Sequence, residues 1–242
     1  MTYLSSNQLK QYEDKGFVSP IDIFSKDKAK EIRNEIELIE KEMPNELEKS
    51  GRYNAHLISP LLDEVTHNSE ILDAVQSLIG KDILVCGTTL FIKNPNVKGF
   101  VSYHQDAKYI GLEPHNWVTA WVAITDSNEH NGCMRVWSGS HKDNLKDHDQ
   151  NFNERNLLTR GQTINNVPKE KTTPLILKAG QMSLHHPTVV HGSDLNHSND
   201  RRIGFVIQSY IGTNVKQILG KNSVQLARGK DNFNFHKKIG RT

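Results

Sequence analysis

A histidine and an aspartate, His104 and Asp106, stand one residue apart in the segment YHQDAKY. On a strand, residues i and i+2 point to the same face, so this imidazole and this carboxylate would reach one point. Gln105 would then face away. Two such ligands hold a divalent metal weakly, and iron(II) oxygenases use two histidines and one carboxylate, which leaves three positions free for substrates. A metal site here therefore requires a second histidine from a distant segment.

Twelve histidines are present, and four of them are candidates for this ligand: His141, His185, His186 and His191. His191 stands out because it opens the segment HGSDLNHSNDRR, which leads into a β-rich run. We expect His185 and His186 to lie in the core or beside the ligands. The other histidines away from His104 stand in polar or turn-like surroundings and are expected to be exposed; they are His56, His67, His115, His130, His148, His197 and His236.

Ser193 and Arg202 follow His191 in the same segment. Arginine is the natural anchor for a carboxylate, because its planar guanidinium group donates two parallel charge-assisted hydrogen bonds. An organic acid that chelates a metal at one end would carry its remote carboxylate several ångströms away, where such a group could meet it. We interpret Arg202 with Ser193 as a candidate anchor for 2-oxoglutarate.

Composition excludes several other classes of function. The 30 basic and 28 acidic side chains leave a net charge of +2, too small to collect nucleic acid. The basic C-terminal stretch 228–242 is expected to be a solvated tail. With only Cys86 and Cys133, no apolar leader and no long apolar run, the sequence predicts a cytoplasmic protein without disulfides or a membrane span.

The hydrophobic pattern changes along the chain. Three helices are expected in residues 1–80: one that Ser6 caps and Gly16 stops, one that Ser25 caps and Pro44 ends, and one at about 69–79. From Lys81 the period becomes two, which predicts a mainly β fold, a sandwich or small barrel. The β-rich runs are 82–93, 117–124, 134–137, 173–178, 181–186 and 202–211.

We expect the whole chain, 1–242, to be one domain, in which a helical N-terminal region (1–80) precedes a β core (81–212) and a C-terminal extension (213–242). The polar segment 142–171 is long for a connection inside a compact domain, so it is expected to be a lid, a binding insert or a disordered segment.

Four segments together resemble the phytanoyl-CoA dioxygenase family of iron(II)- and 2-oxoglutarate-dependent oxygenases: YHQDAKY, TAWVAITD, NEHNGCMRVWSGSHK and HPTVVHGSDLNHSNDRR. The resemblance covers roughly residues 5–212. It implies a double-stranded β-helix, a cupin-like jelly roll with the N-terminal helices packed outside. It also implies that His104, Asp106 and His191 are the catalytic iron ligands, and that Arg202, with Ser193, binds 2-oxoglutarate.

The resemblance further implies that Trp121 lines the site. The activity implied is hydroxylation of an aliphatic C–H bond with dioxygen and 2-oxoglutarate, releasing succinate and carbon dioxide, with ascorbate as a candidate reductant. Asp106 occupies the position that related halogenases leave open for chloride, so hydroxylation is preferred. We expect a small polar metabolite as substrate. Six residues that flank the metal motifs are candidates to face it: Lys93, Tyr103, Lys108, Tyr109, Trp117 and Arg135.

Three alternatives stay open at this point. Lys93 could bind the co-substrate, a substrate anion or only solvent. Two histidines, a carboxylate and a water would also suit a zinc hydrolase, although that reaction gives no role to Arg202 and Ser193. A jelly roll could also be a binding module without catalysis.

Overall fold

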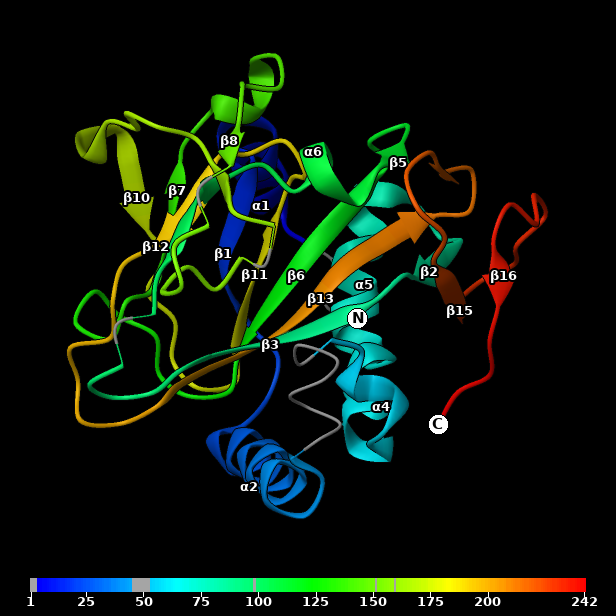
Figure 1. The fold of residues 1–242 in the computed structure, drawn as a ribbon. Coiled ribbons are helices and arrows are strands. Elements are labelled where there is room, and N and C mark those ends of the chain that lie inside the picture. Colours follow the sequence, from blue (N-terminus) through cyan, green and yellow to red (C-terminus); the bar gives the residue numbers. More distant parts are fainter. Residues whose placement is uncertain (1–3, 45–52, 98, 151, 159) are drawn as a thin grey trace.

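The structure, a computed structural model, describes residues 4–44, 53–97, 99–150, 152–158 and 160–242. Two main sheets organise the fold (Figure 1). The larger runs in the order β1 (Phe17–Asp22), β11 (Gln181–His185), β6 (Trp117–Ala123), β13 (Arg202–Gly212), β2 (Ile83–Val85), β15 (Ser223–Arg228) and β16 (Lys237–Lys238), with β3 (Thr88–Lys93) also paired to β13. The smaller runs β10 (Thr172–Pro174), β7 (Met134–Trp137), β12 (His191–Ser193) and β4 (Val101–His104).

Two short pairs of strands lie outside these sheets. One joins β14 (Lys216–Gln217) to β5 (Leu112–Glu113), and the other joins β8 (Asp149–Gln150) to β9 (Gln162–Thr163) within the polar insert. Three short 3-10 helices complete the connections: η1 (Ala55–Leu57), η2 (Ser140–Lys142) and η3 (Lys169–Lys171).

The central strands β6 and β13 of the larger sheet are buried on both faces, and their side chains alternate between the two faces. On β13, Ile203, Phe205 and Ile207 belong to an outer core shared with the helices, whereas Val206 belongs to a smaller apolar cluster. That cluster includes Met134 of β7 in the smaller sheet, so it lies between the two sheets. The inner face of the larger sheet can therefore present side chains to the smaller sheet, and it carries Thr119, Trp121, His185 and Arg202.

The helices cover the outer face of the larger sheet (Figure 1). α2 (Lys26–Glu42) begins where the Ser25 hydroxyl accepts from the Lys28 amide at 3.1 Å, and it buries an apolar stripe at spacings of three and four. α5 (Ser69–Ile79) ends at Gly80, as predicted. α1 (Ser6–Lys15) is capped by Ser5, one residue before the predicted cap, and stops at Gly16. The described residues also form the helices α4 (Pro60–Thr66) and α6 (Ala107–Ile110).

The predicted mainly β architecture, a jelly roll with the N-terminal helices outside, is confirmed. Several boundaries differ. The run 82–93 is two strands, the run 173–178 forms a strand only over Thr172–Pro174, and α4 was not expected. The larger sheet also reaches beyond 81–212, since it takes in β1 and β15. The assignment of 1–242 to one domain stays a prediction.

Among the described residues, no helix combines the length and the apolar character that crossing a bilayer requires.

Candidate metal centre and co-substrate pocket

His104 and His191 are direct partners in the antiparallel pairing of β4 and β12. Their ring centroids lie 4.2 Å apart. The Nδ1 atom of His104 lies 2.9 Å from the Ser102 carbonyl oxygen, and that of His191 lies 3.1 Å from the Val189 carbonyl oxygen. A carbonyl only accepts, so Nδ1 carries the proton in both rings and the free lone pair is on Nε2. Both imidazoles can therefore offer Nε2 to a metal.

Asp106 completes this group, but from a different backbone than we expected. The prediction that it shares a strand with His104 is wrong: β4 ends at His104, and Asp106 is helical (φ −57°, ψ −40°) at the start of α6. The turn still brings Oδ1 to 3.3 Å from Nε2 of His104 and 3.8 Å from Nε2 of His191. One ligand atom from each of the three residues lies within 4.8 Å of the others.

Burial and neighbouring side chains together set the protonation states of His191 and Asp106. Burial, and next the neighbouring His104, lower the pKa of His191 to about 3. Burial alone would raise the pKa of Asp106, but His191, His104 and His185 together bring it well below its usual range. A neutral imidazole and a carboxylate are the states that bind a metal. Three lone pairs directed at one small space favour a cation between them.

The second oxygen of Asp106 is held from the larger sheet. The Thr119 hydroxyl lies 2.9 Å from Oδ2 and 2.8 Å from the Gln208 carbonyl oxygen, so its one proton is shared between two acceptors. Nε2 of His185 lies 3.5 Å from the same Oδ2. These contacts fix the carboxylate with Oδ1 toward the two imidazoles, which favours a single-oxygen ligand.

Arg202 opens β13 on the inner face of the sheet. Its side chain is 1% exposed, and its Nε and Nη2 atoms have no hydrogen-bond partner in the described portion of the chain. The guanidinium carbon lies 5.2 Å from the centre of the Trp121 ring. Burial lowers the pKa of Arg202 to about 10, so the group stays cationic at neutral pH. A buried charge without a partner is strongly unfavourable, and a ligand carboxylate would satisfy it.

Lys93 lies next to Arg202, but it does not line the cavity that Arg202 faces. It is the cross-strand partner of Arg202, is 2% exposed, and donates from Nζ to Ser193 Oγ at 2.7 Å, to the Asp194 carbonyl and to the Gly132 carbonyl at 3.4 Å. Burial, and next the charge of Arg202, lower the pKa of Lys93 to about 6. When Lys93 is protonated it donates to Ser193, which leaves the Ser193 hydroxyl proton available to a ligand. The structure thus gives Lys93 an indirect position at the expected co-substrate site.

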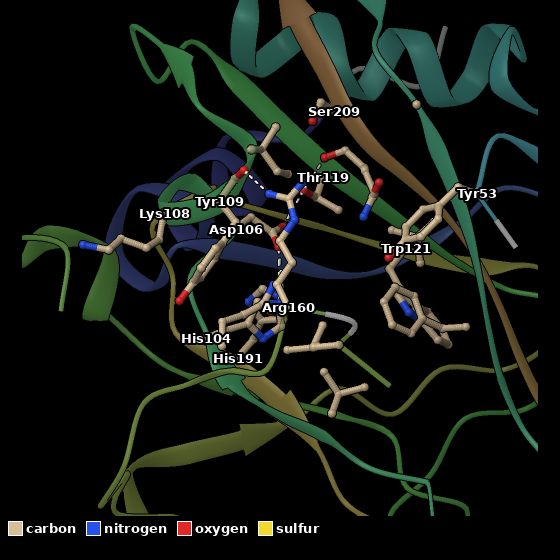
Figure 2. A pocket seen from close by; sticks show the side chains of 18 of the residues that line it. Tyr53, His104, Asp106, Lys108, Tyr109, Thr119, Trp121, Arg160, His191 and Ser209 are labelled. Atoms are coloured by element: carbon tan, nitrogen blue, oxygen red, sulfur yellow. Dashed lines mark hydrogen bonds and ion pairs between the residues drawn. The ribbon is translucent and has the colours of Figure 1, made fainter. Parts of the chain in front are cut away.

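A cavity of about 650 Å³ lies between the sheets, and Trp121, Ser193 and Arg202 line it together with the three ligand candidates (Figure 2). Of the six residues expected to face a substrate, Lys108 and Tyr109 line this cavity. Trp117 is buried in the core. The polar insert contributes to the wall, as expected for a binding insert, through Leu158, Arg160 and Gln162.

Several lining residues were not found from the sequence, among them Thr119, Gln208, Ser209 and Arg160. Gln208 had a usable signal, because it stands six residues after Arg202 on the same predicted strand, and alternate residues of a strand share a face. Two of the histidines expected to be exposed are instead buried: His56 pairs with the Thr88 hydroxyl, and His236 with the Val215 carbonyl. His186 contacts the Thr188 hydroxyl at 2.8 Å and is not a member of the metal group.

Residues 12–204 match the phytanoyl-CoA dioxygenase (PhyH) family. The chain belongs to this family. Among its relatives is the phytanoyl-CoA dioxygenase domain-containing protein 1 homolog of Caenorhabditis briggsae, 28% identical over 66% of this chain. The chain spans only 58% of that protein's length. A probable alpha-ketoglutarate-dependent hypophosphite dioxygenase of Stutzerimonas stutzeri is 25% identical, with 89% of this chain and 81% of that protein covered.

Solved structures of the non-heme monooxygenase ThoJ share the fold of this chain. The apo form is 30% identical, with a TM-score of 0.85, and 96% of this chain and 87% of that chain are covered. A nickel complex of ThoJ is 28% identical, with a TM-score of 0.80 and coverages of 96% and 88%. The resemblance that the four sequence segments predicted is therefore confirmed.

Proposed function

We propose that this chain is an iron(II)- and 2-oxoglutarate-dependent dioxygenase that hydroxylates an aliphatic C–H bond of a small polar metabolite. One arrangement carries the proposal: the convergence of His104, Asp106 and His191 beside Arg202, whose buried guanidinium group has unpaired nitrogens. The family relationship adds weight, because relatives of similar sequence are named as a dioxygenase and a monooxygenase.

The donor set fits iron. Two imidazole nitrogens and one carboxylate oxygen form the facial triad typical of non-heme iron(II) oxygenases, with the remaining positions open to other ligands. In this chain His104, His191 and Asp106 would hold the ion. The ring tautomers that the Ser102 and Val189 carbonyls fix are the ones a metal requires.

The pocket also fits 2-oxoglutarate. Arg202 can donate two parallel hydrogen bonds to a carboxylate, and the Ser193 hydroxyl lines the same cavity. A zinc hydrolase that used the same three ligands would leave this buried cation without a partner. The unpaired nitrogens of Arg202 therefore favour an acid co-substrate over a water-only site.

When bound, iron(II) and 2-oxoglutarate would react with dioxygen to supply the oxidant for hydroxylation. The 2-oxoglutarate would be converted to succinate and carbon dioxide. The chain's residues position these reactants. The Thr119 hydroxyl holds the outer oxygen of Asp106, while Arg202 and Ser193 would orient the remote carboxylate of the co-substrate. The two sheets keep all of these groups largely away from bulk water, which strengthens each electrostatic contact.

The proposal is tested by oxygen-dependent succinate release. Protein stripped of metal by a chelator is supplied with iron(II) or with zinc(II), and succinate is measured with 2-oxoglutarate and ascorbate against a panel of small polar metabolites. We expect succinate only with iron and dioxygen, and faster release with the true substrate. Zinc-supported turnover without oxygen, or no succinate with iron across the panel, would overturn the proposal.

A further inference from the structure

We infer that the substrate carries an anionic group and that Arg160, in the polar insert, binds this group at the mouth of the cavity. This inference rests on the proposed function and names the substrate class for the same site. It starts from the position of one side chain that neither the metal group nor the co-substrate anchor uses.

Arg160 lines the same cavity as the metal group but comes from a different region of the chain. Its Nη1 atom donates to the Tyr109 carbonyl oxygen at 2.9 Å, as Figure 2 shows. Within the described ranges this is its single hydrogen bond, and no acidic side chain forms an ion pair with it. A guanidinium group has five N–H donors, so most of those of Arg160 are free for a ligand.

The charges around the cavity do not balance without an anionic substrate. Asp106 is the one acidic residue among the described residues that line it, whereas Lys108, Arg160 and Arg202 are basic. A doubly charged iron ion and Arg202 would be neutralised by Asp106 and by 2-oxoglutarate, which is a dianion. Arg160 and Lys108, both exposed to solvent, then remain as positive charges without an acidic partner in the described lining. A cleft lined by one sign of charge concentrates ligands of the opposite sign.

Arg160 is better placed than Lys108 to touch the substrate. In Figure 2 the Lys108 side chain extends away from His104 and His191, so its ammonium group lies farther from the metal group. Arg160 reaches Tyr109, which directly follows Lys108 beside the metal group. A planar guanidinium group also binds carboxylates and tetrahedral oxyanions through two hydrogen bonds, which lysine cannot do.

The rest of the described cavity wall is neutral, and it mixes apolar side chains such as Phe91, Met134 and Leu219 with polar ones. Gln208, Ser209, Asn54 and Asn222 line it and offer amide and hydroxyl groups. A cationic substrate would find no carboxylate in the described lining except Asp106, which the metal would occupy. The expected substrate therefore bears a carboxylate, or an oxyanion of phosphorus or sulfur.

The test compares small probes that differ mainly in charge. Butyrate, propylphosphonate, butyramide and butylammonium are titrated calorimetrically into protein saturated with iron(II) and 2-oxoglutarate under anaerobic conditions. We expect at least one of the two anions to bind about tenfold or more tightly than butyramide. Arg160→Gln should weaken that anion by roughly 10- to 100-fold, because charge-assisted hydrogen bonds are lost, and Arg160→Lys should restore some of the affinity.

Arg155→Gln is the matched control, since Arg155 is an exposed arginine of the same insert that does not line this cavity. It should leave all four affinities unchanged. Preference for butyrate indicates a planar carboxylate, and preference for propylphosphonate indicates a tetrahedral oxyanion. The inference is overturned when butyramide binds as tightly as both anions, or when Arg160→Gln leaves anion affinity unchanged.

The visible band of the iron(II)–2-oxoglutarate pair is recorded in every sample. A normal band without anion preference overturns this inference alone. A missing band in the wild type overturns the proposed function and, with it, the inference.

Discussion

Replacing Asp106 by alanine is expected to abolish succinate formation and to weaken iron binding by more than ~100-fold, because even the partners that orient metal ligands contribute 10- to 100-fold. The variant removes the one carboxylate of the metal group and leaves only His104 and His191. Iron affinity is measured by anaerobic titration, and turnover by succinate release coupled to product formation.

Asp147→Ala is a suitable control, since Asp147 is exposed in the polar insert and does not line the cavity. It should keep the iron affinity and the turnover of the wild type. Circular dichroism and thermal unfolding would show that the Asp106 variant still folds. Full coupled activity in a folded Asp106→Ala protein would contradict the assignment of this carboxylate as a ligand.

Replacing Arg202 by methionine should weaken 2-oxoglutarate binding by at least ~30-fold, because losing one partner of a buried charge pair costs about 2–5 kcal/mol. The same change should leave the ligand-free protein as stable as the wild type or more stable. The reason is that a buried cation with unpaired nitrogens is replaced by an apolar side chain of similar length. Titration of 2-oxoglutarate and thermal unfolding without ligand measure the two effects separately.

The neighbouring arginine provides the control for this experiment. Arg201 points to the other side of the sheet, where it pairs with Glu40 at 2.7 Å and with Glu37 at 3.4 Å on α2. Arg201→Met should therefore lose a little stability and keep the 2-oxoglutarate affinity. Loss of co-substrate binding in the Arg201 variant, with normal binding in the Arg202 variant, would contradict the assignment of Arg202 and indicate Arg201 as the anchor.

The spacing of apolar residues predicted those helices whose formation depends mainly on residues close together in the sequence. The stripe Ala29, Ile32, Ile36 and Ile39 predicted α2, because a helix repeats every 3.6 residues and these positions share one face. β1 was missed because its six residues contain Pro20, and its pairing with β11 shifts register around that position. An edge strand of this kind depends on its neighbour, which the sequence alone does not show.

The residues of the candidate site also divide into those found from the nearby sequence and those that only the fold brings together. His104 and Asp106 were found together because they are near in sequence, and His191 was found through the segment that follows it. Thr119 and His185 were not assigned to Asp106, since their contacts join residues 13 and 79 positions apart in the chain. Such contacts follow from how the strands pair.

Arg160 was missed for a related reason. Nothing in a polar insert marks one arginine as facing inward, and only the folded chain brings it to the Tyr109 carbonyl, 51 residues away. Lys93 shows a different case, since its position on a strand next to the metal motifs left contact with the co-substrate, with a substrate anion or only with solvent as alternatives. The alternation of β3 against β13 instead places it behind Ser193.

Joint binding of iron(II) and 2-oxoglutarate by this chain is tested most simply by an anaerobic titration of 2-oxoglutarate into the iron-loaded wild-type protein, followed by visible absorption. We predict a weak metal-to-ligand charge-transfer band that saturates at one equivalent of co-substrate and is lost in Asp106→Ala. Absence of the band in wild-type protein that demonstrably contains iron(II) would contradict the assignment of His104, Asp106, His191 and Arg202.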